Sequence, residues 1–267
     1  MSKSRLDSLL TERGLYESRS RAAAAVMAGK VRLGGDGRRA EKPGQMVAGD
    51  VAVAVDAGDE YVSRGGVKLA NALDAFGVDV AGRRCLDVGA STGGFTDCLL
   101  QRGAEHVVAL DVAYGELDWR LRGDPRVTVV ERSNARALDP AALPYRPDLI
   151  VVDLSFISLR KVLPAVLAAA STGGFDCLAL VKPQFELGRE RVGSGGVVRS
   201  AADRREALVA VGDFVVAELG LSVLGFASSG LPGPAGNRES FIWIRPAGDA
   251  RAVPDVAAAA AEVEAGP

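Results

Sequence analysis

The first part of the chain alternates between helical and strand-like spacing of its apolar residues. Leucines three and four residues apart, followed by a glycine, predict a short helix over residues 5–14. An alanine-rich stretch that ends at Gly29 predicts a second helix, with Ser18 or Ser20 as its cap. Short apolar runs separated by glycine-rich and Pro-Gly turns then predict a small sheet over residues 31–55.

The rest of the chain has a different pattern, in which continuous apolar runs alternate with helical segments. Strands are predicted within residues 83–91, 106–112, 127–132, 148–156 and 177–185. Helices are predicted within residues 68–77, 92–103, 159–171 and 203–220. A loop rich in glycine and proline precedes residues 241–246, which we expect to be the last strand of a closing hairpin. The alternation implies an α/β fold with a parallel sheet that is covered on both faces.

The change of pattern divides the chain into four segments. Glycines and charges interrupt the periodicity over 56–66, and we expect the domain boundary there. We expect a small α+β domain at 1–59, a linker at 60–66 and a large α/β domain at 67–250. The remaining residues, 251–267, are expected to form a C-terminal tail of low complexity that is frayed at its end.

Composition narrows the class of protein without identifying it. The 267 residues are 48% hydrophobic and 25% charged, which is typical of a soluble globular protein. No apolar run approaches the roughly 20 residues of a membrane span, and the charged N-terminus has no signal-peptide pattern, so we expect a cytoplasmic protein with no membrane partner. Three cysteines without a CxxC pair and a single histidine, His106, predict no metal site and a structural role for that histidine.

Basic residues are concentrated at the start of the chain, although the net charge is only −2. Residues 1–42 hold ten basic and five acidic side chains, a balance of +5. Such an arrangement can bind phosphates at several points, but on charge alone an ordinary solvated face is slightly favoured. The residues of this segment that are candidates for phosphate contact are Arg5, Arg19, Arg21, Lys30 and Arg32.

A glycine-containing loop follows the first strand of the large domain, with the sequence DVGASTGGF from Asp87 to Phe95. Ligands of parallel sheets bind at the carboxyl ends of the strands, and glycines there let the backbone approach a ligand closely. Asp111 ends the next strand, where its carboxylate can accept hydrogen bonds from ribose hydroxyls. The glycines do not spell GxGxxG, and the acid before them suits a cationic ligand, so the loop resembles the S-adenosylmethionine site of Rossmann-like methyltransferases. The expected cofactor contacts are Asp87, Gly89, Ser91, Thr92, Gly93, Gly94, Phe95, Asp111, Val112, Asn134 and Ala135.

As a whole, the chain resembles the TlyA family of ribosomal RNA 2′-O-methyltransferases. The resemblance is carried by RLDSLLTERGLYESRSRAAAAVMAGKVRLGG, SRGGVKL, CLDVGASTGGFTDCLLQRGA, DLSFISL, LVKPQFE and GPAGNRESF. It implies a small N-terminal α+β S4-like RNA-binding domain and a Rossmann-like class I, FtsJ-like methyltransferase domain. The implied cofactor is S-adenosylmethionine, and the implied substrate is a cytidine ribose of ribosomal RNA within ribosomal subunits, with no obligate protein partner. The S4 resemblance makes RNA binding the better interpretation of the basic N-terminal segment.

The family resemblance also implies a catalytic set of two lysines and two carboxylates, matched here by Lys68, Asp153, Lys182 and Glu239. Each alone has a simpler explanation, as a solvated lysine, a cap or a loop charge. Asp153 and Lys182 nevertheless follow apolar strands and should emerge at the same sheet edge as the glycine loop. We expect Lys182 to lie nearest the ribose 2′-hydroxyl, with Asp153 close to the transferred methyl group. Lys68 and Glu239 would orient the site.

Two further residues near this set are candidates for RNA contact, namely Arg64 and Phe156. The ring of Phe156 could stack on an extruded base, and packing in the core is an equally good explanation.

Three other functions have to be weighed against this one. A base methyltransferase would carry an Asn/Asp-Pro-Pro-aromatic segment where this chain has Asp153-Leu-Ser-Phe156. An RNA-binding assembly factor with a vestigial cofactor pocket would not need an intact catalytic set. The family has also been labelled haemolysin, but the sequence has no spanning or strongly basic amphipathic segment that would suit a membrane-active toxin.

Overall fold

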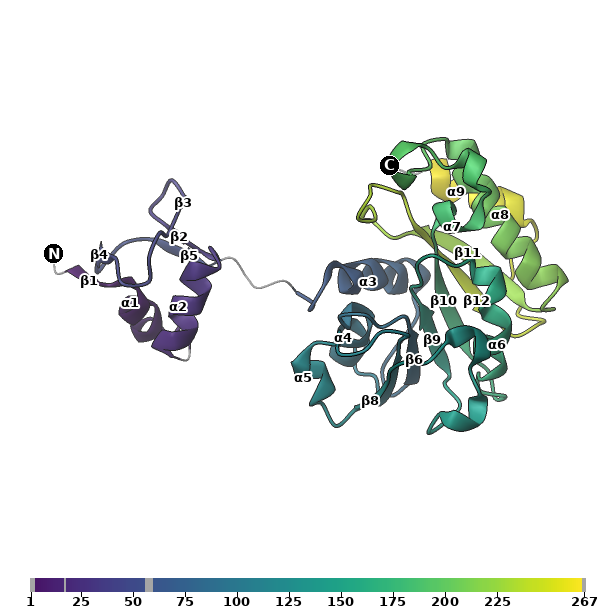
Figure 1. The fold of residues 1–267 in the computed structure, drawn as a ribbon, viewed down its shortest axis with the longest axis horizontal. Coiled ribbons are helices and arrows are strands. Elements are labelled where there is room, and N and C mark those ends of the chain that lie inside the picture. The colour runs from purple at the N-terminus through teal and green to yellow at the C-terminus, as the bar shows by residue number, and fades with distance from the viewer. Residues whose placement is uncertain (1–2, 17, 56–59, 266–267) are drawn as a thin grey trace. The chain divides into compact units, whose positions relative to one another are not determined.

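The computed structural model describes residues 3–16, 18–55 and 60–265, and the chain divides into two compact units, residues 1–60 and 61–267 (Figure 1). The division falls within the segment 56–66, of which residues 56–59 lie outside the described part.

The first unit is a small α+β structure. Its elements are β1 Lys3–Arg5, α1 Leu6–Glu12, α2 Arg19–Met27, β2 Val31–Leu33, β3 Arg38–Arg39, β4 Met46–Ala48 and β5 Val53–Val55. Both predicted helices are present, and Ser18 caps α2 by accepting a hydrogen bond from the backbone N–H of Arg21. The sequence pattern missed β1, which pairs antiparallel with β4, because three residues are too few to show an alternation. Leucine and alanine side chains of α1 and α2 pack on β2 to form the core of this unit.

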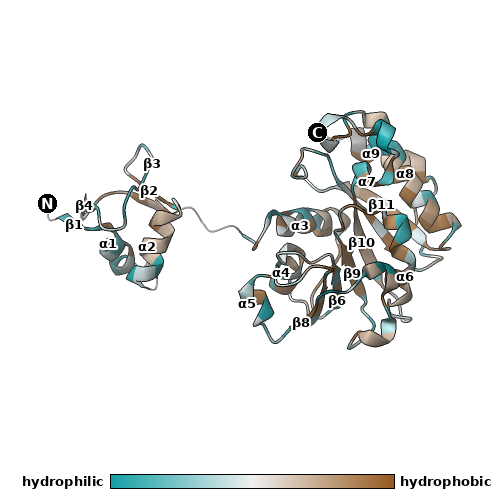
Figure 2. Ribbon diagram, viewed as in Figure 1, coloured by the Kyte–Doolittle hydropathy of each residue, from teal (hydrophilic) through white to brown (hydrophobic). Residues whose placement is uncertain are grey.

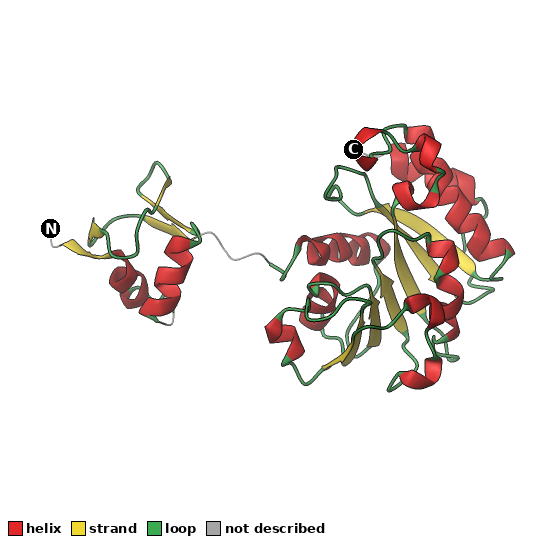
Figure 3. Cartoon of the chain, viewed as in Figure 1, coloured by secondary structure: helices red, strands yellow, loops and turns green. Residues whose placement is uncertain are grey.

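The second unit is built on a seven-stranded sheet between two layers of helices (Figure 3). Its strands are β6 Arg84–Val88, β7 His106–Leu110, β8 Val127–Val130, β9 Leu149–Val152, β10 Asp176–Val181, β11 Ser222–Ser228 and β12 Ser240–Arg245. Its α-helices are α3 Arg64–Phe76, α4 Gly94–Gln101, α5 Trp119–Arg122, α6 Leu163–Ala168, α7 Pro183–Glu186, α8 Ala201–Ala217 and α9 Val256–Ala265.

The sheet order is β11-β12-β10-β9-β6-β7-β8, with five parallel strands from β10 to β8. β12 lies antiparallel between β10 and β11, so the predicted closing hairpin is confirmed. Neighbouring residues of each central strand face opposite cores: Leu86 packs towards α6, α8 and α9, whereas Cys85 packs towards α3, α4 and α5. Burial on both faces accounts for the continuous apolar runs of the sequence, which are the brown strands at the centre of Figure 2.

Helix α3 begins at Arg64, so residues 64–66 belong to its first turn and not to the expected linker. The two glycines of this turn disguised it, because glycine is a poor helix former. A Cβ atom at Gly66 would lie 2.2 Å from the ring of Tyr61, and one at Gly65 would touch Phe95. Packing of the Tyr61 ring therefore requires glycine at position 66, whereas a Cβ atom at position 65 would make only ordinary contacts.

The segment set apart as a tail contains helix α9, which is part of the core. Ala260 is fully buried, and α9 packs against α8 and β11. A Cβ atom at Gly212 of α8 would lie 2.5 Å from Cγ1 of Val256. The alanine run that looked like low complexity thus provides a helix with small side chains that packs closely on α8.

The surroundings of His106 agree with the structural role that is expected of it. Nε2 of His106 lies 2.8 Å from Oγ1 of Thr128 on the neighbouring strand, which is a structural contact. The three cysteines are free and buried, and desolvation raises the pKa of Cys98 to about 11. No helix in the described part of the chain is long and apolar enough to cross a membrane.

Candidate active site

The glycine loop occupies the point where the order of the sheet reverses. β6 lies between β7 and β9, and the chain passes from β6 through the loop into α4 before it forms β7. In open α/β sheets the loops on the two sides of such a point diverge and leave a crevice beyond the carboxyl ends of the strands. The loop therefore lies where the fold provides a ligand site.

Contacts within the protein account for the three glycines of this loop. Gly89 has a φ of +87°, and a Cβ atom there would lie 2.2 Å from the backbone oxygen of Asp153. A Cβ atom at Gly93 would meet the side chain of Leu121 at 2.3 Å, and one at Gly94 would meet the first turn of α3. Packing within the protein is therefore enough to require glycine at these three positions, in addition to the role expected for them in binding a ligand.

Asp87 is a buried carboxyl directly beneath the glycine loop. Its Oδ2 accepts a hydrogen bond of 2.7 Å from Oγ1 of Thr96, and its Oδ1 has no hydrogen-bond partner within the described residues. Burial, with a smaller contribution from the neighbouring carboxylate of Asp153, raises the pKa of Asp87 to about 7. The loop therefore rests on a buried acceptor that a cationic group can satisfy.

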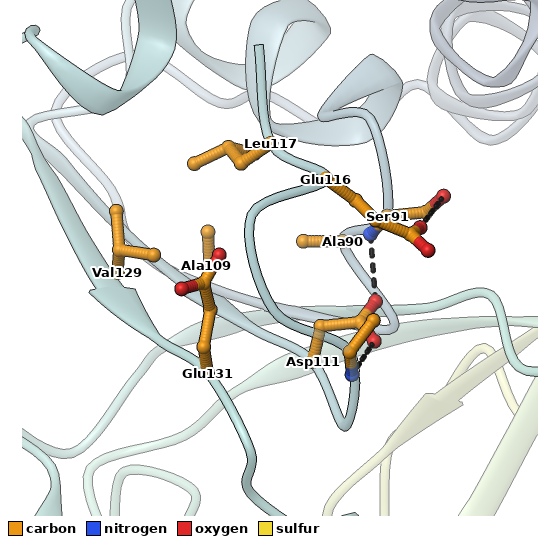
Figure 4. A pocket seen from close by; sticks show the side chains of 9 residues that line it. Ala90, Ser91, Ala109, Asp111, Glu116, Leu117, Val129 and Glu131 are labelled. Carbon is orange, nitrogen blue, oxygen red and sulfur yellow. Dashed lines mark hydrogen bonds between the residues drawn. The ribbon is translucent and has the colours of Figure 1, made fainter. Parts of the chain in front are cut away.

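A pocket beside the loop is lined by carboxylates and small apolar side chains (Figure 4). Asp111 lies at its edge, where Oδ2 accepts from the backbone N–H of Ser91 at 2.7 Å and Oδ1 accepts from that of Ala113 at 2.8 Å. These bonds fix the carboxylate and leave lone pairs on both oxygens for further donors. The lining residues are Ala90, Ser91, Ala109, Asp111, Ala113, Glu116, Leu117, Val129 and Glu131. Three carboxylates around an apolar floor fit a cofactor that combines ribose hydroxyls with a net positive charge.

Seven residues that line this pocket were not predicted from the sequence, and some of the predicted contacts lie elsewhere. The seven are Ala90, Ala109, Ala113, Glu116, Leu117, Val129 and Glu131, of which Glu131 directly follows β8 and could have been found by the same argument as Asp111. Phe95 is buried and packs on Phe241 with ring centroids 5.8 Å apart.

The remaining expected cofactor contacts also lie outside the pocket lining. Ala135 is in the core below α6, and Asn134 caps the short 3₁₀ helix Ala135–Ala137 by accepting from the N–H of Arg136. Val112 is exposed at the surface, and the carbonyl of Thr92 accepts from the N–H of Asp118.

Two ion pairs lie at the carboxyl edge of the sheet, and the first joins neighbouring strands. Asp153 follows β9 and Lys182 follows β10, which are adjacent and parallel. Nζ of Lys182 lies 2.5 Å from Oδ1 of Asp153 and donates a hydrogen bond of 3.1 Å to Oγ of Ser155. The sequence prediction that these two side chains emerge at one edge agrees with this geometry.

The second ion pair joins helix α3 to the start of β12. Nζ of Lys68 donates to Oε2 of Glu239 at 2.5 Å, and both side chains are buried. Val181 pairs with Ser240 in the ladder between β10 and β12, so Lys182 and Glu239 flank the same register position. The backbone oxygen of Asp153, in turn, lies against Gly89 of the glycine loop. The four residues of the expected catalytic set therefore converge at the edge that carries the loop.

Phe156 projects from the loop after β9 instead of packing in the core. The residue is 91% exposed, and its backbone is left-handed with a φ of +67°. The core-packing explanation of this residue is therefore wrong. Arg64 is also exposed on this unit, where one guanidinium nitrogen donates to the carbonyl of Pro232 at 2.7 Å in the loop before Glu239.

In the first unit, an aspartate organises part of the basic segment. Arg5 donates two hydrogen bonds to the carboxylate of Asp7, and Arg19 lies 3.6 Å from the same group. Hydrogen bonding from Arg5 lowers the pKa of Asp7 to about 2. Arg21 and Arg32 are exposed, and Lys30 is half-buried. Asp7, which is buried and contacts both arginines, was not predicted from the sequence pattern.

Comparisons with known proteins agree with the division into two units. The S4 domain model matches residues 4–53, and the model of the FtsJ-like methyltransferase matches residues 61–245. The chain is 53% identical over 245 residues to the 16S/23S rRNA (cytidine-2'-O)-methyltransferase TlyA of Mycobacterium tuberculosis, covering 91% of this chain and 90% of that protein. It is 39% identical over 205 residues to Hemolysin A of Brachyspira hyodysenteriae, covering 76% and 84%. A solved structure from Streptococcus thermophilus, described as a hemolysin, matches with a TM-score of 0.72 at 38% identity and covers 99% of this chain and 97% of that one.

Proposed function

Because this chain belongs to the FtsJ-like methyltransferase family and shares the two-domain composition of TlyA proteins, we propose that it methylates the 2′-oxygen of a cytidine ribose in ribosomal RNA. The cofactor in this proposal is S-adenosylmethionine, and the S4 domain binds ribosomal RNA within ribosomal subunits. The enzyme acts in the cytoplasm, without an obligate protein partner.

The observation that carries the proposal is the convergence of two lysines and two carboxylates beside the glycine loop. Val181 and Ser240 pair in the sheet, Lys182 directly follows Val181, and Glu239 directly precedes Ser240. Lys182 and Glu239 each belong to an ion pair of 2.5 Å. Methyl transfer to a hydroxyl needs an oriented oxygen whose proton is removed as it attacks. Paired lysines and carboxylates supply groups for both tasks.

The cofactor would be held on the side of the glycine loop that faces Asp111. When bound, S-adenosylmethionine supplies an electrophilic methyl group on a sulfonium. Asp111 would accept hydrogen bonds from the ribose hydroxyls, since backbone N–H groups already fix its carboxylate. Oδ1 of Asp87 offers a buried acceptor to the cationic end of the cofactor. Glu116 adds negative charge to the same pocket, whereas the charge of Glu131 is balanced by its ion pair with Arg122.

In the transfer step, Lys182 is the group proposed to lie nearest the ribose 2′-hydroxyl. Nζ of Lys182 would take up the hydroxyl proton as the ribose oxygen attacks, while the bound cofactor would supply the methyl group. Asp153 and Ser155 fix the position of that nitrogen. Lys68 and Glu239, buried beside it, orient the site and balance its charge.

The test is transfer of a radiolabelled methyl group to isolated ribosomal subunits, followed by nuclease digestion to nucleosides. We expect the label in 2′-O-methylcytidine. Label in a base-methylated nucleoside, or no transfer to either subunit, would contradict the proposal.

The role of Lys182 has a separate test. Lys182→Ala should lower the single-turnover rate by at least about a hundredfold, as is typical for loss of a general base. A near-normal rate across the pH range would remove Lys182 from this role and leave the substrate assignment standing.

A further inference from the structure

The loop after β9 and the segment after β10 lie side by side beyond the edge of the sheet. Directly after the two strands, Asp153 and Ser155 of the first segment contact Nζ of Lys182 in the second. Further on, the rings of Phe156 and Phe185 lie 5.3 Å apart at an angle of 50°. The two segments therefore touch repeatedly, from the ion pair outward.

Glu186 closes the far end of this contact. Its side chain is 1% exposed, although it belongs to a short helix at the surface of the unit. Oε1 accepts a hydrogen bond of 2.7 Å from the backbone N–H of Leu159, and Oε2 accepts one of 2.6 Å from Oγ of Ser158. Arg160 donates a hydrogen bond to the backbone oxygen of Glu186 at 3.0 Å, and its Nε lies 3.5 Å from Oε2. One carboxylate thus holds three consecutive residues of the loop.

The conformation of the loop shows why it needs such a restraint. Phe156 has a left-handed backbone, which is strained for a residue with a bulky side chain, and its own ring is almost fully exposed. A strained backbone persists only where the surrounding structure determines it. The fixed points on either side are the ion pair at Asp153 and the Glu186 contacts at Ser158 and Leu159.

We propose that Glu186 is a positioning residue for methyl transfer, which holds the loop 153–160 so that Asp153 and Ser155 fix Nζ of Lys182. The proposal rests on the proposed function only for its effect on rate. Glu186 does not itself touch the reacting atoms, because both of its carboxylate oxygens are already used by the loop and are shielded from solvent.

The restraint itself can be measured without any assay of activity. In the full-length protein, hydrogen–deuterium exchange of the Leu159 amide should be at least tenfold faster in Glu186→Ala than in wild type. Glu186→Gln should exchange like wild type, because its amide oxygen can accept from Leu159 and its amide nitrogen can donate to Ser158. Glu190→Ala is the matched control, since Glu190 is exposed and lies four residues further along.

The effect on chemistry is measured by single-turnover methylation of ribosomal subunits at saturating cofactor. Glu186→Ala should slow the step by about ten- to a hundredfold, because a displacement of about 1 Å can cost a hundredfold in rate. Its cofactor Kd should stay within twofold of wild type, since Asp111 and Asp87 are held by other contacts. Glu186→Gln and Glu190→Ala should keep the rate within threefold. A residue that only stabilised the fold would lower the melting temperature and leave the rate of the folded enzyme unchanged.

Each other outcome overturns the proposal. An exposed Leu159 amide with an unchanged rate in Glu186→Ala would show that the loop does not position Lys182. Equal slowing by Glu186→Gln would show that the charge matters and not the hydrogen bonds. If Glu186→Ala does not fold, Ser158→Ala removes one of the same hydrogen bonds, and an unchanged rate in that variant overturns the proposal equally. If wild type itself transfers no methyl group, the proposed function fails, whereas amide exchange still decides whether Glu186 restrains the loop.

Discussion

The buried ion pair between Lys68 and Glu239 allows the stability of the second unit to be separated from its chemistry. The two side chains are 8% and 1% exposed, and they join α3 to β12 across 171 positions of sequence. Substitution of either one by methionine leaves the other charge buried and without its partner. Removal of one member of a buried pair costs about 3–5 kcal/mol, because the remaining charge then has neither hydration nor a partner.

The double variant Lys68→Met/Glu239→Met should behave differently from both single variants. Replacement of a whole buried ion pair by apolar side chains of similar volume is often neutral for stability, so we expect its free energy of unfolding within about 1 kcal/mol of wild type. Methyl transfer should remain absent in the double variant, because neither charged group is present at the site. The double variant should thus regain the stability of wild type without regaining its methyltransferase activity.

Tryptophan fluorescence can follow this unfolding, since both tryptophans of the chain, Trp119 and Trp243, belong to residues 61–267. At about 2–4 °C per kcal/mol for a unit of this size, each single variant should melt roughly 6–20 °C below wild type. Urea unfolding gives the free energies directly. A loss below about 1 kcal/mol in both single variants, which is the range of exposed ion pairs, would refute the reasoning. So would a double variant that methylates ribosomal RNA.

Asp111, Asp87 and the arginines of the first unit each provide a further test. Asp111→Ala should raise the Kd of S-adenosylmethionine at least about tenfold, since hydrogen bonds to a charged group contribute about 1.5–3 kcal/mol, and unchanged affinity in calorimetry would contradict this role. Burial raises the pKa of Asp87 to about 7 in the folded protein, whereas an unfolded aspartate titrates near pH 4. The stability that the protonated carboxyl contributes should therefore be complete below about pH 4 and be lost as the pH rises to about 7. Urea unfolding of wild type and Asp87→Asn tests this, because the variant should not show the loss. Neutralisation of Arg5, Arg19 and Arg21 together should weaken RNA binding and leave cofactor affinity unchanged. The slope of log K against log salt concentration should become less steep by up to about 0.9 for each duplex phosphate that the protein no longer binds. An unchanged slope in filter binding would mean that these arginines do not bind phosphate.

The amino-acid sequence determined the class of fold and the edge of the sheet at which the chemistry lies. Continuous apolar runs mark strands that are buried on both faces, and their alternation with helices forces the parallel order that brings strand ends together. Asp111, Asp153 and Lys182 could be assigned to one edge for this reason, because each directly follows such a run.

Only the tertiary structure decided which of these groups meet. Local periodicity records whether a position is buried, but ion pairs such as Lys68–Glu239 depend on the order and register of strands that are distant in sequence. Phe156 has a hydrophobic side chain and a left-handed backbone and is exposed, and the sequence could not decide between this position and packing in the core. Glu186 is an acidic residue that a sequence pattern assigns to the surface. It is buried because the loop of a neighbouring strand covers it and satisfies both of its oxygens, and no local signal specifies that arrangement.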